Sequence, residues 1–259
     1  MASQGLLERA GGVLFRWRSF TPVPLVLIAL PLLWRSRGAA SPLWFAAGLL
    51  LCVLGQALRA WVIGQVPDGT SGQNERLIAT QLNTSGPYAY TRNPLYLGNF
   101  GITLGLCVAA HQPILLALVA LLFALQYRAI IAAEEAFLRG QFGAAFDDFC
   151  ARVPRFWPQL RPAQISPAHS WSLRRAVRKE HNPLAAWAAL LLVFSALDRA
   201  ADAHRAGAAF GLRSFGLLPS VSALLALLVV YLGVKGWKHR WFSGGFAEDL
   251  RRRVRESAR

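Results

Sequence analysis

The chain has 259 residues, of which 54% are hydrophobic and only 16% are charged, and its mean hydropathy is +0.35. Soluble domains carry about 25% charged residues, so the composition argues against a soluble protein and for an integral membrane protein. A formal net charge of +15 would suggest nucleic-acid binding in a soluble chain, but these arginines lie between apolar runs, where membrane orientation explains them and no nucleic-acid partner is expected.

The apolar residues fall into six segments along the chain. A helix needs about 20 apolar residues to cross a hydrocarbon core about 30 Å thick. The first segment, which prolines interrupt, and the short fifth segment are therefore marginal spans. The sequence predicts an all-α integral membrane protein, a multispan helical bundle of about six transmembrane helices. The segments are residues 19–34, 42–64, 95–111, 113–131, 184–197 and 215–234.

The placement of basic residues predicts the orientation of this bundle. With a cytoplasmic N-terminus and six spans, 23 lysines and arginines lie on the cytoplasmic side and 5 on the other. Cytoplasmic loops of membrane proteins carry an excess of Lys and Arg, so both termini are expected in the cytoplasm. The two long connections, 65–94 and 132–183, then face the cytoplasm as well, and chemistry is expected there.

The segment SGPYAYTRNPLYLGNF, residues 85–100, leads into the third apolar run. Asn93 is a favourable N-cap and Pro94 suits the first helical position, so a helix is expected to begin here. Its free N–H groups, with the Arg92 guanidinium beside them, would attract an anion. Gly98 leaves room for a ligand or a second helix to approach. The alternative is a capped span whose arginine is only an anchor at the lipid head groups.

Two adjacent acids follow the fourth apolar run. Residues 132–152 look helical, and the spacing of their apolar residues places Glu135 on the apolar stripe, next to Glu134. A carboxylate in that position is unfavourable unless it is paired. The alternative is an interfacial helix whose acids reach water or pair with Arg128 or Arg139.

The third and fourth runs are separated by only three residues, His111-Gln112-Pro113. Residues 95–131 are therefore expected to form a tight antiparallel hairpin, the core of the bundle. The hairpin returns the two acids to the membrane face that carries Arg92 and Asn93. Polar clusters of opposite sign are thus predicted to converge there.

The rest of the second cytoplasmic connection divides into two parts. Residues 153–167 form a strap with four prolines, which cannot be a continuous helix. Residues 171–180 set apolar side chains against four basic ones, as in a helix lying on an anionic leaflet. We expect such interfacial helices to contact anionic lipid head groups; a solvated charged linker is the alternative.

These clusters suit a ligand such as S-adenosylmethionine. Arg92 and the helix N-terminus could hold its carboxylate, and the two acids could hold its ammonium or hydroxyl groups. Tyr88, Tyr96 and Phe100 could line the adenine or face the sulfonium. Another nucleotide or an anionic lipid would fit these residues equally well. No GxGxxG motif is present, and the scattered histidines and cysteines do not predict a metal site.

SGPYAYTRNPLYLGN, followed by EEAFLRGQFGAAFDDFCARVPRFWP, resembles the isoprenylcysteine carboxyl methyltransferase and phospholipid methyltransferase superfamily. The signature of that superfamily is GPY-x-x-x-RHP-x-Y-x-G, then EE-x-x-L-x-x-x-F/Y-G-x-x-Y-x-x-Y, then VPR-x-x-P. The resemblance covers residues 65–160 and leaves 160–259 outside. It implies a multispan enzyme that binds S-adenosylmethionine at the cytoplasmic ends of its core helices and methylates a lipid-like or prenylated acceptor entering from the bilayer.

The resemblance also implies roles for single residues. Arg92 and Glu135 would lie closest to the acceptor and the chemistry, and Glu135 would take the proton of an amine or thiol acceptor. Asn93 stands where histidine is usual, so an imidazole base is excluded, and Phe146 and Phe149 stand where tyrosines are common. The implied cofactor contacts are Tyr88, Asn93, Pro94, Tyr96, Gly98, Glu134 and Glu135.

The predicted function is therefore membrane-embedded methyl transfer from S-adenosylmethionine to a carboxylate, amine or thiol of a lipid-like acceptor. One alternative is a sterol-type reductase, which resembles this superfamily in its membrane core and binds a nicotinamide cofactor. Another is a non-catalytic lipid-binding membrane protein. The predicted divisions are 1–64 (N-terminal transmembrane helices), 65–160 (methyltransferase core), 161–183 (basic interfacial linker) and 184–259 (two-helix extension with a basic tail).

Overall fold

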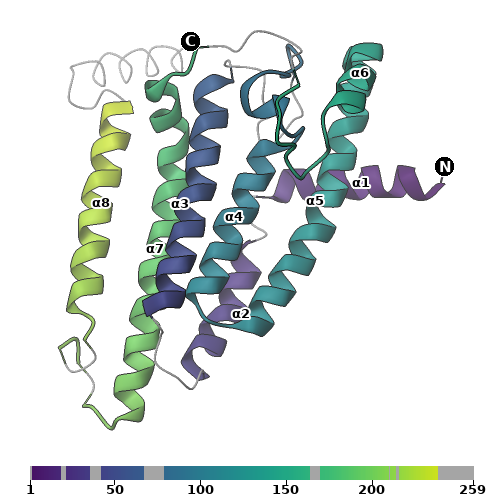
Figure 1. Ribbon diagram of the computed structural model, residues 1–259. Helices are drawn as coiled ribbons and strands as arrows, with labels where there is room; N and C mark the ends of the chain where they lie inside the picture. Colours follow the sequence, from purple (N-terminus) through teal and green to yellow (C-terminus); the bar gives the residue numbers. More distant parts are fainter. Residues whose placement is uncertain are drawn as a thin grey trace, which may run out of the picture.

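The structure is a computed structural model that describes residues 2–18, 22–35, 42–66, 79–163, 170–209, 211–213 and 216–238. Within these residues the protein is all helical, as predicted, and Figure 1 shows most of the long helices running side by side. Residues 67–78, within the first predicted cytoplasmic connection, and the basic residues 239–259 lie outside the described residues. The helices are α1 (Ala2–Trp17), α2 (Pro22–Arg35), α3 (Pro42–Gln65), the 3₁₀ helix η1 (Gly86–Ala89), α4 (Pro94–Ala109), α5 (Pro113–Phe142), α6 (Ala144–Arg152), α7 (Leu173–Arg205) and α8 (Leu218–Lys238).

Each of the six predicted apolar segments lies largely in a helix where it is described. Among the described residues, four helices are long and apolar enough to cross a membrane: α3, α5, α7 and α8. The apolar part of α2 and the 16-residue α4 are shorter. At 1.5 Å per residue, α4 is about 24 Å long, less than the hydrocarbon core. The chain is an integral membrane protein. The predicted number of six spans is not confirmed, because α2 and α4 are shorter than a membrane-crossing helix. The fifth segment, predicted to be marginal, lies within the 33-residue α7.

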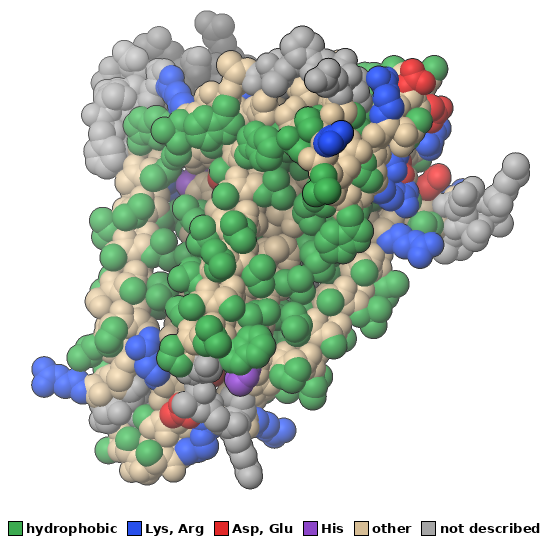
Figure 2. All heavy atoms as spheres, viewed as in Figure 1, with side chains coloured by type: hydrophobic (Ala, Val, Ile, Leu, Met, Phe, Trp, Pro, Cys, Tyr) green, Lys and Arg blue, Asp and Glu red, His purple; other side chains and the backbone are tan. Residues whose placement is uncertain are grey.

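The outer surface agrees with a membrane setting. Figure 2 shows hydrophobic side chains along the helical wall, with Lys, Arg, Asp and Glu near its two ends. On α8, Leu225, Val229 and Val230 are exposed, and only 6% of the apolar window of this helix is buried within the protein. Apolar side chains on such a wall face hydrocarbon favourably.

α3 and α4 pack through glycines. A Cβ at Gly55 would lie 2.6 Å from the carbonyl oxygen of Gly98, and one at Gly105 would lie 2.6 Å from Cys52 Sγ and from the carbonyl oxygen of Gly48. Small residues let helix backbones approach closely in membranes. α4 therefore packs along α3, and Gly98 faces a second helix.

The predicted hairpin of the third and fourth runs is present as α4 and α5, joined through His111, whose φ is +52°. Figure 1 shows α5 leaning away from α4 toward the end that carries α6. The hairpin is thus closed at its turn and open at its other end. The predicted helix over 132–152 is broken at Gly143, whose φ of +51° interrupts it between α5 and α6. Left-handed φ is tolerated best by glycine.

The strap that follows α6 is not helical over 153–163, as predicted. It lies against the segment that precedes α4. The Arg92 amide donates to the carbonyl of Pro154 (2.9 Å), and the amides of Gln159 and Ala163 donate to the carbonyls of Tyr90 (3.0 Å) and Ala89 (2.9 Å).

The basic stretch before the fifth apolar run is not a separate helix on the leaflet, which corrects the prediction for 171–180. Residues from Leu173 onward form the first turns of α7, and the Ser172 side chain caps them by accepting from the Arg175 amide (3.3 Å). Trp171 donates to the carbonyl of Ala60 (3.2 Å) and Arg175 to that of Gly64 (3.1 Å). These bonds fix the start of α7 to the end of α3.

Candidate active site

A cavity of about 910 Å³ lies between the diverging ends of α4 and α5 and the neighbouring α7, with α2 at its far end. One end is lined by polar residues, among them Arg92, Tyr96 and Glu134. The other end is lined by apolar residues such as Leu106, Val119 and Phe194, and adjoins a buried apolar cluster. The cavity is therefore amphipathic along its length. Its polar end lies at the open end of the predicted hairpin, and its apolar end reaches residues near the turn.

Arg92 and Glu135 meet at the polar end, as predicted from the hairpin. Arg92 Nη1 lies 3.4 Å from Glu135 Oε1, and these side chains are only 15% and 12% exposed. Arg155, from the strap, donates through Nε to both Glu135 oxygens (3.1 Å each) and through Nη2 to Oε2. Glu135 thus joins two guanidinium groups from different segments. Arg92 Nε is buried and has no hydrogen-bond partner within the described residues.

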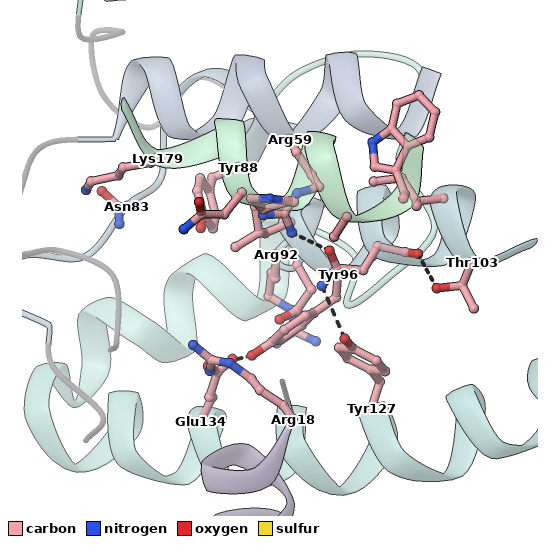
Figure 3. Close-up of a pocket in the computed structure, with 18 of the residues that line it drawn as sticks. Arg18, Arg59, Asn83, Tyr88, Arg92, Tyr96, Thr103, Tyr127, Glu134 and Lys179 are labelled. Carbon is pink, nitrogen blue, oxygen red and sulfur yellow. Dashed lines mark hydrogen bonds between the residues drawn. The ribbon is translucent and has the colours of Figure 1, made fainter. Parts of the chain in front are cut away.

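Glu134 accepts a hydrogen bond from the Tyr96 hydroxyl at 2.7 Å. The Tyr96 ring contacts Tyr127 edge to face, with centroids 4.6 Å apart, and the Tyr127 hydroxyl accepts from Asn99 Nδ2 (3.2 Å). Figure 3 shows Tyr96, Tyr127 and Glu134 on one wall of the cavity. The arrangement joins a carboxylate and two aromatic rings across α4 and α5.

Tyr88 belongs to η1 and lines the same cavity. Its ring packs against the buried cluster of Phe146, Phe149 and Val153. Burial, and secondarily the charge of Glu134, raise the pKa of Tyr88. Its phenol therefore stays protonated at neutral pH and can donate a hydrogen bond to a ligand.

The remaining predicted residues have different surroundings. Asn93 is the N-cap residue of α4 and lines the cavity, but its side chain makes no capping bond; instead its amide donates to the carbonyl of Arg155 at 2.7 Å. Pro94 is the first residue of α4 and is buried. Gly98 packs against Arg59 and Gly55 of α3. Of the predicted residues, Pro94, Gly98 and Phe100 do not line the cavity.

Sequence analysis missed a second polar cluster, which lies farther along the cavity wall. Arg59 of α3 donates to Glu180 of α7 and, through Nη1, to Asn99 of α4. Gln56 donates to Glu180 (2.8 Å) and accepts from Trp187 (2.9 Å). Two signals could have indicated it: an asparagine inside an apolar run, and a single acid in the basic stretch WSLRRAVRKE.

Arg18, also missed, reaches the cavity from the end of α1. The sequence suggested only a basic residue near the membrane surface, because the amphipathic α1 is not an apolar run. Within the described residues, no group of three or more His, Cys, Asp and Glu side chains could hold a metal ion.

Parts of the chain are similar to known proteins. A family model described as phospholipid methyltransferase matches residues 43–145, from α3 to the start of α6. A protein-S-isoprenylcysteine O-methyltransferase of Rattus norvegicus is 32% identical over 127 residues, which are 46% of this chain and 43% of that protein. No solved structure matches the chain.

Two bacterial proteins are also similar. The nickel-cobalt-cadmium resistance protein NccN of Alcaligenes xylosoxydans xylosoxydans is 43% identical over 82 residues, 32% of this chain and 38% of that protein. The cobalt-zinc-cadmium resistance protein CzcN of Cupriavidus metallidurans is 35% identical over 120 residues, 46% and 51% of the two chains. The chain thus spans about half or less of the length of these relatives.

Proposed function

Since the chain belongs to the superfamily of phospholipid and isoprenylcysteine methyltransferases, we propose that it is a membrane-embedded enzyme that transfers a methyl group from S-adenosylmethionine to a lipid-like acceptor. The observation that carries this proposal is one cavity that has a charged, aromatic end and an apolar end. Neither the family nor the relatives identify the acceptor. The resistance proteins' names describe those proteins and say nothing of the chemistry of this cavity.

The residues at the polar end fit the methyl donor and the head group of the acceptor. The buried Arg92 Nε lacks a hydrogen-bond partner within the described residues, and a buried donor left unpaired is unfavourable, so an oxygen of the acceptor's head group would satisfy it. Glu134 and the phenol of Tyr88 could hold the ammonium and the hydroxyl groups of the donor. Tyr96 offers an aromatic ring to a sulfonium.

The apolar end fits the tail of the acceptor. Leu106, Val119 and Phe194 there come from three different helices, α4, α5 and α7. A volume of about 910 Å³ is at the upper end of the range for small-molecule sites, about 300–1,000 Å³. It leaves room for part of an acceptor beside the donor, and an acyl or prenyl chain could enter from the bilayer.

S-adenosylmethionine, when bound, supplies an electrophilic methyl group on a sulfonium. The protein's part is then to orient donor and acceptor and to exclude water, effects that lower the barrier of a displacement reaction. Arg92, held by Glu135, would place the reacting head group of the acceptor. Both Glu135 oxygens already accept from Arg155, which favours a carboxylate acceptor that needs no base. For an amine or thiol acceptor, Glu135 remains the proposed base.

The remaining predictions concern the setting of the site. We propose that the polar end faces the cytoplasm, with both termini on that side, in accordance with the excess of basic residues there. The basic residues near this end would contact anionic lipid head groups.

The test is methyl transfer by the protein in its membrane. Membranes that contain the protein are incubated with S-adenosylmethionine labelled in its methyl group, and label is sought in lipid and in protein. Release of the label by alkali would identify an ester and therefore a carboxylate acceptor. Failure of the purified protein to bind S-adenosylhomocysteine in calorimetry would refute the proposal. Binding of NADPH would favour the reductase, and binding of lipid alone the non-catalytic alternative.

A further inference from the structure

α1 is an amphipathic helix that packs across α5, outside the segment that the family model matches. Gly11 faces α5 so closely that a Cβ there would collide with the carbonyl oxygen of Ala129. Phe15 is 3% exposed and packs with Tyr96, Ile130 and Ile131. Arg16, one residue further along, is exposed. One side of α1 is thus held against the helix that carries Glu134.

Arg18 extends from the end of α1 into the polar end of the cavity. Its guanidinium lies over the Phe15 ring, 3.8 Å from the centroid, and its amide donates to the Phe15 carbonyl (3.4 Å). Figure 3 shows its side chain pointing toward Glu134, and the two charges interact. A guanidinium stacked on a buried ring loses little freedom when it binds a ligand.

Two groups of charges surround Glu134 and Glu135 at this end of the cavity. Arg92 and Arg155 both face Glu135, whereas Arg18 faces Glu134. The second group presents one cation and one carboxylate side by side. An α-amino acid head group, with one ammonium and one carboxylate, complements such a pair in both charges.

We propose that the amino-acid end of the methyl donor binds between Arg18 and Glu134, its carboxylate on the Arg18 guanidinium and its ammonium on Glu134. α1 is then part of the donor site, and Arg92 is left to the head group of the acceptor. This inference rests on the proposed function.

The experiment compares two ligands that differ in the amino-acid group. S-adenosylhomocysteine carries it, and 5′-methylthioadenosine has the same nucleoside thioether without it. The full-length protein, Arg18→Gln and Arg16→Gln are titrated with each ligand by calorimetry. We expect Arg18→Gln to lower the affinity for S-adenosylhomocysteine by about tenfold or more, because the variant loses a charge-assisted hydrogen bond to the ligand. The affinity of Arg18→Gln for methylthioadenosine should equal that of the wild-type protein. Arg16→Gln should change the affinity for neither ligand.

Two outcomes would overturn the inference while leaving the proposed function intact. Unchanged affinity of Arg18→Gln for S-adenosylhomocysteine would show that Arg18 does not bind the donor. An equal loss of affinity for both ligands would show that Arg18 only holds α1 in place. Thermal unfolding of the variant would then show a lower stability than that of the wild-type protein. Arg18→Lys, which keeps the charge, should recover part of the affinity. If the wild-type protein bound no S-adenosylhomocysteine, the proposed function would fail and the inference with it.

Discussion

Glu180 of α7 holds Arg59 of α3 by a two-point ion pair, in which Arg59 Nε and Nη2 donate to different carboxylate oxygens, each at 2.8 Å. The two side chains are 7% and 12% exposed. Arg59 in turn donates to Asn99 of α4, and Asn99 to Tyr127 of α5. Hydrogen bonds therefore connect α7, all of which lies beyond the family match, with the wall of the cavity.

Replacing Glu180 should destabilise the protein. Glu180→Gln leaves the Arg59 charge buried without a counter-ion, which typically lowers the free energy of unfolding by about 3 kcal/mol or more. The measurement is thermal or denaturant unfolding in one detergent. The double variant Arg59→Met with Glu180→Leu, which removes both charges, should recover much of the loss.

The control for that prediction lies on the same helix. Asp202 and Arg205 of α7 form a more exposed pair, with side chains 42% and 35% exposed. Because such pairs contribute little, Asp202→Asn should change the free energy of unfolding by less than about 1 kcal/mol. Equal effects of Glu180→Gln and Asp202→Asn would contradict a buried structural role for the Glu180 pair.

The close packing of α3 on α4 predicts a difference between two glycines. Gly55→Ala places a Cβ 2.6 Å from the Gly98 carbonyl oxygen and 2.8 Å from the Ile102 amide nitrogen. Because the helices must then separate, we expect the free energy of unfolding to fall by about 1–3 kcal/mol. At Gly140 of α5 nothing lies within 4 Å of the added Cβ, and Gly140→Ala should raise stability by about 0.5–1 kcal/mol through helix propensity. Unfolding of the two variants and the wild-type protein measures both changes in the free energy of unfolding. If both substitutions destabilised the protein, the packing argument would be refuted.

Several of these features could be predicted from sequence because they are local. The start of α4 at Pro94 depends on two adjacent residues, and the meeting of Arg92 with Glu135 follows from a three-residue turn between two helices. The helical nature of every apolar segment follows from the need to satisfy backbone groups inside a bilayer.

Other features depend on partners that are distant in the chain. The Arg59–Glu180 pair joins residues 121 positions apart, and no periodicity indicates that choice. Gly98 was compatible with a ligand or a helix, and only the path of α3 decides for the helix. Arg18 was counted as a surface charge, because its helix is too polar to be recognised as a span and its interaction with Glu134 joins residues far apart in the chain.

The hydrogen bond from Tyr96 to Glu134 predicts a role for one hydroxyl group. Tyr96→Phe keeps the ring contact with Tyr127 but removes a charge-assisted donor. We expect about tenfold to a hundredfold weaker binding of S-adenosylhomocysteine, because Glu134 loses the group that orients it. Tyr90→Phe is the matched control, since Tyr90 precedes α4 but does not line the cavity. Similar affinities for the two variants would exclude the proposed role of the Tyr96 hydroxyl.

The Asn93 side chain holds the strap, which leads to a prediction that separates this role from helix capping. Aspartate caps helices as well as asparagine does, but it has no side-chain N–H to donate to the Arg155 carbonyl. Asn93→Asp should therefore leave α4 intact and increase hydrogen exchange in residues 153–163. Asn93→His keeps a ring N–H and should retain the slower exchange, which would explain how the histidine usual at this position can be replaced. Exchange in Asn93→Asp equal to that of wild type would show that the bond to Arg155 does not hold the strap.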